Sequence, residues 1–259
     1  MIKKIFILEN KKIKGIEKEK EKIEDLLKSC GKVVEKIFES PDLILTLGGD
    51  GTILNAIRMV KDRKTLIYGI NYGKKGFLTN SSENIEKKIK DLLKGEFRIC
   101  ERMLIELNIE RKSMSVYRER ALNDFLIFRN NIRIITIEVF LNDKEKFEFR
   151  GDGILISTPT GSTAHSLSTG GPIIYPEFDS ILITPFAPYS LSIRPLILSP
   201  ETKIKIKISS SGKVISDGQV EFNIEKDDII EIKKSDIKAN LIIEESFFDK
   251  LITKFNFGK

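Results

Sequence analysis

The spacing of hydrophobic residues along the chain changes near residue 98. Before that point, short apolar runs alternate with segments in which apolar residues recur every three or four positions. Strands that alternate with helices in this way predict a parallel sheet covered by helices. We expect strands at 5–8, 43–47 and 66–70, and helices near 16–29, 52–62 and 83–94.

Beyond residue 98, apolar and polar residues alternate one by one, which predicts antiparallel strands with one buried face. We therefore expect an N-terminal α/β domain at 1–98 and a β-rich domain at 99–243. The segment 244–259 is amphipathic again, and we expect it to pack back across the domain junction. The alternating segments are MLIELNIER (103–111), RIITIEVFLND (133–143), KEKFEFR (144–150), KIKIKIS (203–209) and DDIIEIKK (227–234).

Composition narrows the class of protein. The 259 residues are 41% hydrophobic, which is enough for a sizeable globular core. The sequence shows no run long enough for a membrane span and no signal peptide, so we expect a cytoplasmic protein without a membrane partner. Cys30 and Cys100 lack the spacing of a disulfide framework or a zinc site. The basic residues behind the net charge of +6 are dispersed along the chain, so they do not indicate a nucleic-acid partner. The positive charge would suit a phosphate-rich small molecule.

The sequence LGGDGT (47–52) places a carboxylate among glycines where a buried strand gives way to a helix. Glycines tolerate left-handed backbone and let N–H groups approach an anion, so Gly48, Gly49 and Gly51 are candidates for a phosphate-binding turn. An aspartate beside phosphates can accept a proton from an attacking hydroxyl or act on a bound Mg²⁺, which makes Asp50 the candidate catalytic residue. The alternative is an ordinary tight turn in which Asp50 is the N-cap.

A second stretch, GDGILISTPTGSTAHSLSTGGP (151–172), is rich in small hydroxyl residues and free of Lys and Glu, although 32% of the chain is charged. It is either buried against a polar ligand or a solvent-exposed loop. Asp152 is either a turn residue or an acceptor for a ribose hydroxyl. Asn123 and Asp124 precede a continuous apolar strand, so this pair either forms a turn or binds a base edge and a ribose hydroxyl.

Together these stretches resemble the NAD kinase family. LGGDGT, the downstream Asn-Asp pair, DGILISTPTGSTA and SLSTGGP occur in the family's order, and IRPLILSP (193–200) and SDGQ (216–219) extend the resemblance over essentially the whole chain. Diacylglycerol and sphingosine kinases resemble the family at GGDGT, whereas the long second motif is specific. The resemblance implies a Rossmann-like, phosphofructokinase-like α/β domain with a parallel sheet, which the C-terminal segment rejoins, and a C-terminal β-sandwich-type domain.

The resemblance also implies an activity: transfer of the γ-phosphoryl group of ATP to the 2′-hydroxyl of the adenosine ribose of NAD, with Mg²⁺ or another divalent cation, to give NADP. It implies that Asp50 is the proton acceptor and that Gly51 lies beside the dinucleotide. Homodimers or homotetramers with sites at the subunit interface are expected, and no metal ligand is assigned. The residues that match the family's dinucleotide contacts are Asn123, Asp124, Arg150, Asp152, Thr163, Ala164, His165, Ser166, Ser168 and Gln219.

Three positions depart from the family's usual residues. His165 stands where the family usually has Tyr, Tyr189 where it often has His, and Asp124 where it usually has the longer Glu. An imidazole can stack and hydrogen-bond but covers less area than a phenol ring. His165 therefore either contacts the ligand or has a structural role. Because it is the single histidine of the sequence, a multi-histidine metal site is excluded.

Three other functions are weighed against this one. A diacylglycerol-type lipid kinase would share GGDGT but would need an apolar groove or a membrane anchor, and the sequence shows no basic amphipathic anchor. A non-catalytic dinucleotide sensor would bind without turnover, although Asp50 and the glycine turn are intact. A Rossmann-type dehydrogenase is not supported, because ENKKIKG (9–15) rather than GxGxxG follows the first expected strand.

Overall fold

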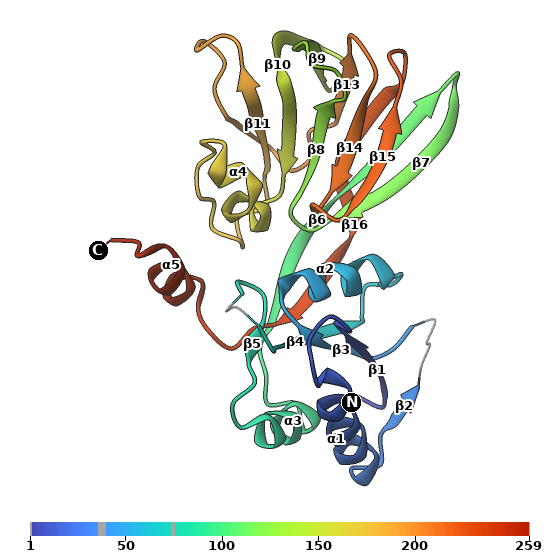
Figure 1. Cartoon of the computed structure of the whole chain (residues 1–259), viewed down its shortest axis with the longest axis vertical. Coiled ribbons are helices and arrows are strands. Elements are labelled where there is room, and N and C mark those ends of the chain that lie inside the picture. Colours follow the sequence, from blue (N-terminus) through green and yellow to red (C-terminus); the bar gives the residue numbers. More distant parts are fainter. Residues whose placement is uncertain (1, 36–39, 74–75, 259) are drawn as a thin grey trace. The chain divides into compact units, whose positions relative to one another are not determined.

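The structure, a computed structural model, describes residues 2–35, 40–73 and 76–258. The chain separates into two compact units: unit 1 comprises Met1–Arg102 with Ile237–Lys259, and unit 2 comprises Met103–Asp236. Unit 1 carries helices on a parallel sheet, and unit 2 consists almost entirely of strands (Figure 1). The expected combination of an α/β part and an all-β part is confirmed, while the domain boundaries at 98 and 243 stay a prediction.

Unit 1 is built on a parallel sheet with the strand order β2-β1-β3-β4. β5 and residues 240–242 of β16 also pair with β4 in parallel. The strands are β1 (Lys4–Glu9), β2 (Val33–Glu35), β3 (Leu43–Gly48), β4 (Leu66–Asn71) and β5 (Asn80–Ser81), and the helices are α1 (Ile16–Ser29), α2 (Asp50–Met59), α3 (Ile85–Lys94) and α5 (Phe247–Phe255).

Strand β3 is buried along its whole length. A parallel sheet with helices on its faces buries both sides of a central strand, which explains the continuous apolar run LILTLG. The expected helix at 16–29 is confirmed as α1, and its stripe of Ile16, Ile23 and Leu27 is buried. The helix expected at 52–62 begins earlier, at Asp50, so the aspartate of the GGDG motif lies in the first turn of α2.

Unit 2 is an antiparallel system of strands in the order β15-β14-β8-β10-β9-β13-β16, with β11 also paired to β10. Inward-facing residues of these strands form one hydrophobic core. The strands are β6 (Ile99–Arg111), β7 (Met114–Ala121), β8 (Asp124–Arg129), β9 (Ile135–Leu141), β10 (Glu145–Ser157), β11 (Ile181–Pro188), β12 (Leu196–Leu198), β13 (Ile204–Ile208), β14 (Gly212–Ser216), β15 (Val220–Ile224) and β16 (Ile229–Ile242), and two short helical turns, η1 (Thr160–Thr163) and α4 (His165–Ser168), follow β10.

Strand β10 joins two segments that the sequence analysis treats separately. KEKFEFR and GILIS form one continuous strand, in which residues 145–151 pair with β9 and residues 153–157 pair with β8. The partner changes at Gly151 and Gly153, where neighbouring backbone approaches closely. A Cβ atom on Gly153 would lie 2.3 Å from the carbonyl oxygen of Ile127. Glycine is therefore required for close approach between strands.

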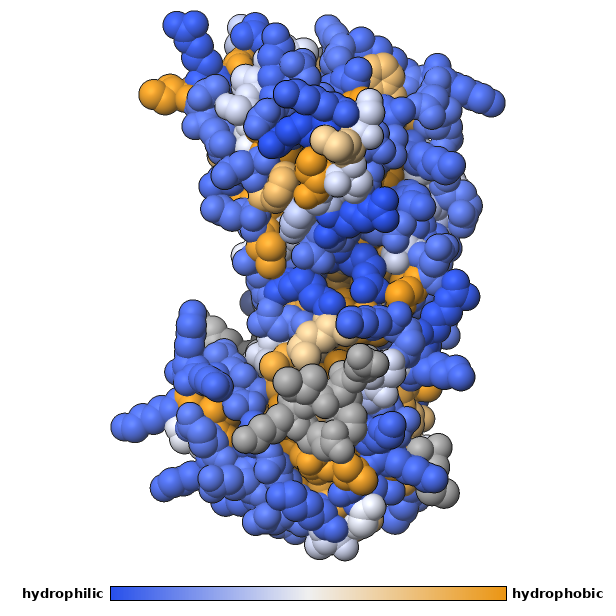
Figure 2. Space-filling view, turned by 90° about the vertical axis from the view of Figure 1, so that its right-hand side faces the viewer, coloured by the Kyte–Doolittle hydropathy of each residue, from blue (hydrophilic) through white to orange (hydrophobic). Residues whose placement is uncertain are grey.

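Side chains of both charges pair at the surface, for example Lys22 with Glu19 and Lys205 with Asp143. The face shown in Figure 2 is mostly hydrophilic, and its hydrophobic residues are exposed in separate small groups. Among the described residues, no helix has the length and hydrophobicity needed to cross a membrane.

Replacement of Gly153 by Ala tests the role of this close approach. Because the new methyl group would overlap the Ile127 carbonyl, we expect Gly153→Ala to lower the free energy of unfolding by about 1–3 kcal/mol. Gly73→Ala is the matched control, since the nearest atom to its new methyl group among the described residues, Asn71 Oδ1, is 3.9 Å away. Urea unfolding of both variants measures the difference. Equal stabilities would show that β8 and β10 can separate without cost.

Candidate active site

The GGDG motif joins the end of β3 to the start of α2. Gly48 ends the strand, Gly49 is the N-cap, and Asp50 is the first helical residue. Neither Gly48 nor Gly49 has a positive φ, so the tolerance of glycine for left-handed backbone is not used at these two positions. Gly48 instead provides space, because a Cβ atom there would lie 2.2 Å from Thr52 Oγ1. The alternative of Asp50 as the N-cap is also wrong, because Gly49 occupies that position.

The Asp50 carboxylate accepts four hydrogen bonds from a segment that follows β4. Oδ2 accepts from the Phe77 N–H at 2.6 Å. Oδ1 accepts from the Leu78 N–H at 3.1 Å, the Thr79 N–H at 3.2 Å and the Thr79 hydroxyl at 3.2 Å. Hydrogen bonds to a carboxylate are charge-assisted and stronger than neutral ones. The four donors therefore fix the orientation of the Asp50 side chain.

Gly76 opens this segment and touches Asp50. A Cβ atom at Gly76 would lie 1.9 Å from Asp50 Oδ1 and 2.5 Å from Thr79 Oγ1. Any larger residue would displace the carboxylate or the donors around it. The segment 76–79 thus encloses one side of the Asp50 carboxylate.

In unit 2, Asp217 organises the backbone around the predicted Asn-Asp pair. Asp217 and Gly218 both have positive φ and form the turn between β14 and β15. The Asp217 carboxylate accepts hydrogen bonds from three consecutive N–H groups, those of Leu122 (3.1 Å), Asn123 (2.7 Å) and Asp124 (3.2 Å). The Asp217 N–H donates in return to the Asp124 carbonyl at 3.0 Å. This turn therefore holds the entry to β8 in place.

The hydroxyl-rich run after β10 packs against the same backbone. The Thr158 hydroxyl donates to the Leu122 carbonyl, and the Thr158 N–H donates to the Asn123 carbonyl at 2.9 Å. A Cβ atom on Gly161 would lie 2.0 Å from the Asn123 carbonyl oxygen. Thr158, Gly161 and Ser162 are buried. The expectation of a buried loop is confirmed for these residues, and the alternative of a solvent-exposed loop is wrong for them.

Asp124 and His165 face each other across this arrangement. His165 Nδ1 lies 4.0 Å from Asp124 Oδ1, and the His165 side chain is 54% exposed whereas that of Asp124 is 2% exposed. Asp124 Oδ1 accepts no hydrogen bond from the part of the chain that the structure describes. Burial, together with the nearby charge of Asp217, raises the pKa of Asp124 to about 7. The site thus contains a buried carboxyl group whose Oδ1 has no donor among the described residues and faces a half-exposed imidazole.

Arg150 and Asp152 lie two residues apart on β10, so both point to the same face of the sheet. Asp152 Oδ1 is 2.6 Å from Arg129 Nε, in an ion pair in which both side chains are mostly buried. The Arg150 guanidinium lies 5.8 Å from the centre of the Tyr189 ring. Because Asp152 lies within a strand, its interpretation as a turn residue is wrong.

The other residues predicted to contact the dinucleotide have various environments. The buried Ser166 hydroxyl is 2.8 Å from Thr184 Oγ1 on β11. The Thr163 hydroxyl donates to the Thr160 carbonyl at 3.2 Å. Their role as ligand contacts stays a prediction. Of the remaining predicted residues, Ala164 is half-buried, and Gly51, Ser168 and Gln219 are exposed.

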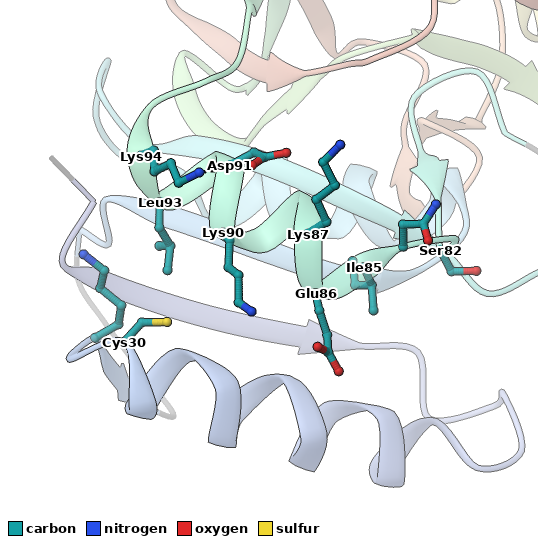
Figure 3. Close-up of a pocket in the computed structure, with 11 residues that line it drawn as sticks. Cys30, Ser82, Ile85, Glu86, Lys87, Lys90, Asp91, Leu93 and Lys94 are labelled. Carbon is teal, nitrogen blue, oxygen red and sulfur yellow. Dashed lines mark ion pairs between the residues drawn. The ribbon is translucent and has the colours of Figure 1, made fainter.

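Two cavities lie away from these residues. One of about 970 Å³ lies beside α3 in unit 1, where Glu86, Lys90 and Leu93 project from α3 toward α1 (Figure 3). Another of about 690 Å³ in unit 2 is lined by β6, β7, β13 and β16. No residue predicted for the site lines either cavity. Neither cavity therefore bears on the predicted phosphoryl transfer.

Two parts of these arrangements were not predicted from the sequence. Asp217 lies within SDGQ, and the Asp-Gly pair there is a typical signal for a hairpin turn, but its contact with the Asn-Asp pair has no local signal. The segment 76–79 contributes mainly backbone N–H groups to Asp50, and such groups are present in nearly every residue. Only the fold brings these partners together.

The fold and the GGDG turn define a class of protein. A glycine turn that joins the carboxyl end of a parallel strand to a helix N-terminus is typical of α/β enzymes that bind phosphorylated ligands. Family models agree: the ATP-NAD kinase N-terminal domain matches residues 4–97, and the ATP-NAD kinase C-terminal domain matches residues 122–243.

Relatives of known name and structure are similar over most of the chain. The NAD kinase of Caldanaerobacter subterraneus subsp. tengcongensis is 39% identical over 231 residues, which cover 86% of this chain and 82% of that protein. The crystal structure of yeast NADH kinase complexed with NADH has a TM-score of 0.90 and 25% identity, and covers all of this chain and 89% of that one. An NAD kinase from Archaeoglobus fulgidus in complex with ATP has a TM-score of 0.80 and 27% identity, with coverage of 97% and 98%.

These similarities confirm the resemblance found in the sequence motifs. The chain belongs to the ATP-NAD kinase family. It is an enzyme that phosphorylates NAD with ATP as the phosphoryl donor.

The raised pKa of Asp124 predicts a pH-dependent stability. Between its ordinary value of 3.8 and about 7, the folded protein holds a proton that the unfolded chain has released. The contribution of Asp124 to the free energy of unfolding therefore falls as pH rises through this window, by at most about 1.4 kcal/mol per pH unit. Asp124→Asn removes this titration, so we expect the variant to gain stability relative to the parent protein between pH 5 and pH 8.

Urea unfolding at pH 5 and pH 8 measures this gain. Asn123→Ala is the control, because it alters the neighbouring neutral side chain and should show a stability difference that does not change with pH. A difference between Asp124→Asn and the parent that is equal at both pH values would contradict the prediction.

Proposed function

We propose that Asp50 is the proton acceptor when this enzyme transfers the γ-phosphoryl group of ATP to the 2′-hydroxyl of the adenosine ribose of NAD. The observation that supports this role is the fixed Asp50 carboxylate at the junction of β3 and α2. A helix N-terminus favours phosphate groups nearby. In the reaction, the 2′-oxygen bonds to the γ-phosphorus, the bond to the bridging oxygen of ADP breaks, and the hydroxyl proton passes to Asp50.

We assign the proton to Oδ2 of Asp50. Oδ1 accepts three hydrogen bonds, whereas Oδ2 accepts one, from the Phe77 N–H, within the described residues. A carboxylate oxygen has two lone pairs, so Oδ2 retains one for the substrate hydroxyl. Phosphoryl transfer depends mainly on positioning and charge stabilisation, which a fixed carboxylate supplies.

The adenosine part of NAD, in this proposal, binds at the cluster of Asn123, Asp124 and His165. The buried Asp124 Oδ1 needs a donor, and a ribose hydroxyl or a base amino group would supply one. The half-exposed imidazole of His165 offers a flat surface and a ring nitrogen beside that oxygen. The further contacts proposed on the family resemblance are Gly51, Arg150, Asp152, Thr163, Ala164, Ser166, Ser168 and Gln219.

Mg²⁺ is proposed to enter the site with ATP. Within residues 2–35, 40–73 and 76–258, no cluster of three or more acidic, His or Cys side chains could hold a metal ion. Mg²⁺ commonly keeps several waters and binds through substrate phosphates with few ligands from the protein. The ion would neutralise charge on the phosphates. In this proposal the phosphates of ATP and water supply the ligands of the ion, and no side chain of the chain is assigned as a metal ligand.

Location and assembly are proposed on the family resemblance. We infer a cytoplasmic homodimer or homotetramer in which subunits share sites. Sedimentation together with activity assays tests this, because monomers that keep full activity on dilution would show that each chain is complete alone.

Asp50→Asn tests the proposed proton acceptor. We expect kcat to fall by about 10²-fold or more, because the amide cannot accept the proton, while the KM for NAD changes little. NADP formation from NAD, ATP and Mg²⁺ is measured with an NADP-specific dehydrogenase. Undiminished turnover in the variant would refute this role.

His165→Ala tests the proposed adenosine contact. We expect the KM for NAD to rise several-fold with little change in kcat, because the interaction is made equally in the ground state and the transition state. His165→Phe, which keeps a ring but loses both nitrogens, separates stacking from hydrogen bonding. An unchanged KM in His165→Ala would remove His165 from the site.

A further inference from the structure

Helix α5 buries a positive charge that the proposed reaction does not use. Lys250 is 2% exposed although it lies in the C-terminal helix, on the same face as Phe247 and Leu251. A lysine ammonium is almost never buried without partners, because its desolvation costs several kcal/mol. Lys250 Nζ donates to the Phe77 carbonyl at 2.7 Å and to the Thr79 carbonyl at 3.3 Å. These two partners belong to the segment that binds Asp50.

A single peptide group connects the two charges. The carbonyl oxygen of Phe77 accepts from Lys250, and the N–H of the same peptide group, that of Leu78, donates to Asp50 Oδ1. In a trans peptide these two groups point in opposite directions, so the ammonium lies on one side and the carboxylate on the other. Each charge polarises the peptide in the sense that strengthens the other hydrogen bond.

Thr79 makes a second connection, which runs through one residue rather than through one peptide group. Its carbonyl accepts from Lys250, while its N–H and its hydroxyl both donate to Asp50 Oδ1. The backbone of residues 77–79 is therefore held from both sides by opposite charges. Without the ammonium, both carbonyl groups would lose a charge-assisted partner, and the N–H groups would be less firmly aimed at the carboxylate.

The rest of α5 packs on this segment through side chains. The Phe77 ring lies 5.3 Å from the Phe255 ring and 6.3 Å from the Phe247 ring, measured between centres. Lys254 Nζ lies 4.5 Å from the centre of the Phe77 ring. These contacts do not involve the backbone of 77–79. They give α5 an anchor that does not depend on Lys250.

We propose that Lys250 is a positioning residue for the phosphoryl transfer, which it serves by holding the backbone of 77–79 so that its N–H groups orient Asp50. The inference rests on the proposed role of Asp50 as proton acceptor. Lys250 is part of the C-terminal helix and lies 200 positions after Asp50 in the sequence. The helix therefore contributes to the reaction as well as to the core.

Lys250→Met tests the proposal, because methionine has a similar length and no charge. We expect kcat to fall about tenfold or more, while the KM values for NAD and ATP stay within about twofold. Lys254→Met is the matched control, since it removes a lysine of the same helix whose Nζ lies against the Phe77 ring, and its kcat should stay within about twofold. Lys250→Arg, which keeps the charge, should recover part of the lost kcat.

Three outcomes overturn the proposal: a kcat in Lys250→Met within twofold of the parent, an equal loss in Lys254→Met, or an effect confined to KM. If the methionine variant does not fold, Lys250→Gln is used, which keeps an N–H donor without the charge, and an unchanged kcat there counts against the proposal. Asp50→Asn, assayed in parallel, separates the two ideas. If Asp50→Asn keeps the kcat of the parent, the role of Asp50 as proton acceptor is refuted. If Asp50→Asn loses turnover while Lys250→Met keeps the kcat of the parent, only the positioning role of Lys250 is refuted.

Discussion

Two carboxylates, Asp50 in unit 1 and Asp217 in unit 2, each accept hydrogen bonds from three consecutive backbone N–H groups. Such converging donors fix a connecting segment without a helix or a sheet ladder. The two units use the interaction in opposite directions. In unit 1 the backbone of 77–79 supports the carboxylate that is proposed to react. In unit 2 the carboxylate supports the backbone of 122–124, which carries side chains proposed to contact NAD.

The second arrangement has a cost. Holding Asp124 beside Asp217 places two carboxyl groups in one buried region, and burial together with this charge raises the pKa of Asp124 to about 7. Its Oδ1 also lacks a donor among the described residues, and an unsatisfied buried group costs about 1–3 kcal/mol. A ligand that brings a donor to Oδ1 recovers part of this energy, whereas one without a donor does not. This unsatisfied buried oxygen therefore lowers the stability of the protein without a ligand, and it favours ligands that bring a donor over ligands that do not.

The periodicity of apolar residues predicts the helices and strands well, because each residue of an element is either buried or exposed and its type reflects this. The run 43–47 and the helix at 16–29 follow directly from it, and the motif LGGDGT places Asp50 at the strand–helix junction. Asp152 was ambiguous because glycines on both sides resemble a turn, whereas they actually allow strands to approach closely. For Lys250 the sequence shows only that a lysine lies on an apolar helix face. The backbone carbonyls that it contacts could not be predicted, because no sequence pattern marks them.

The glycines of these motifs show how a short pattern can place a distant side chain. Gly76 leaves no room for a Cβ beside Asp50, which lies 26 positions earlier, and Gly161 leaves none beside the backbone of Asn123, 38 positions earlier. Gly48 likewise makes room for Thr52. Gly48 and Gly161 do not adopt positive φ, so what glycine contributes at these two positions is the absence of a side chain. Each glycine thus lets a second segment contact a proposed site residue or the helix that carries it. The glycines of these stretches therefore serve packing around the site as much as contact with phosphate.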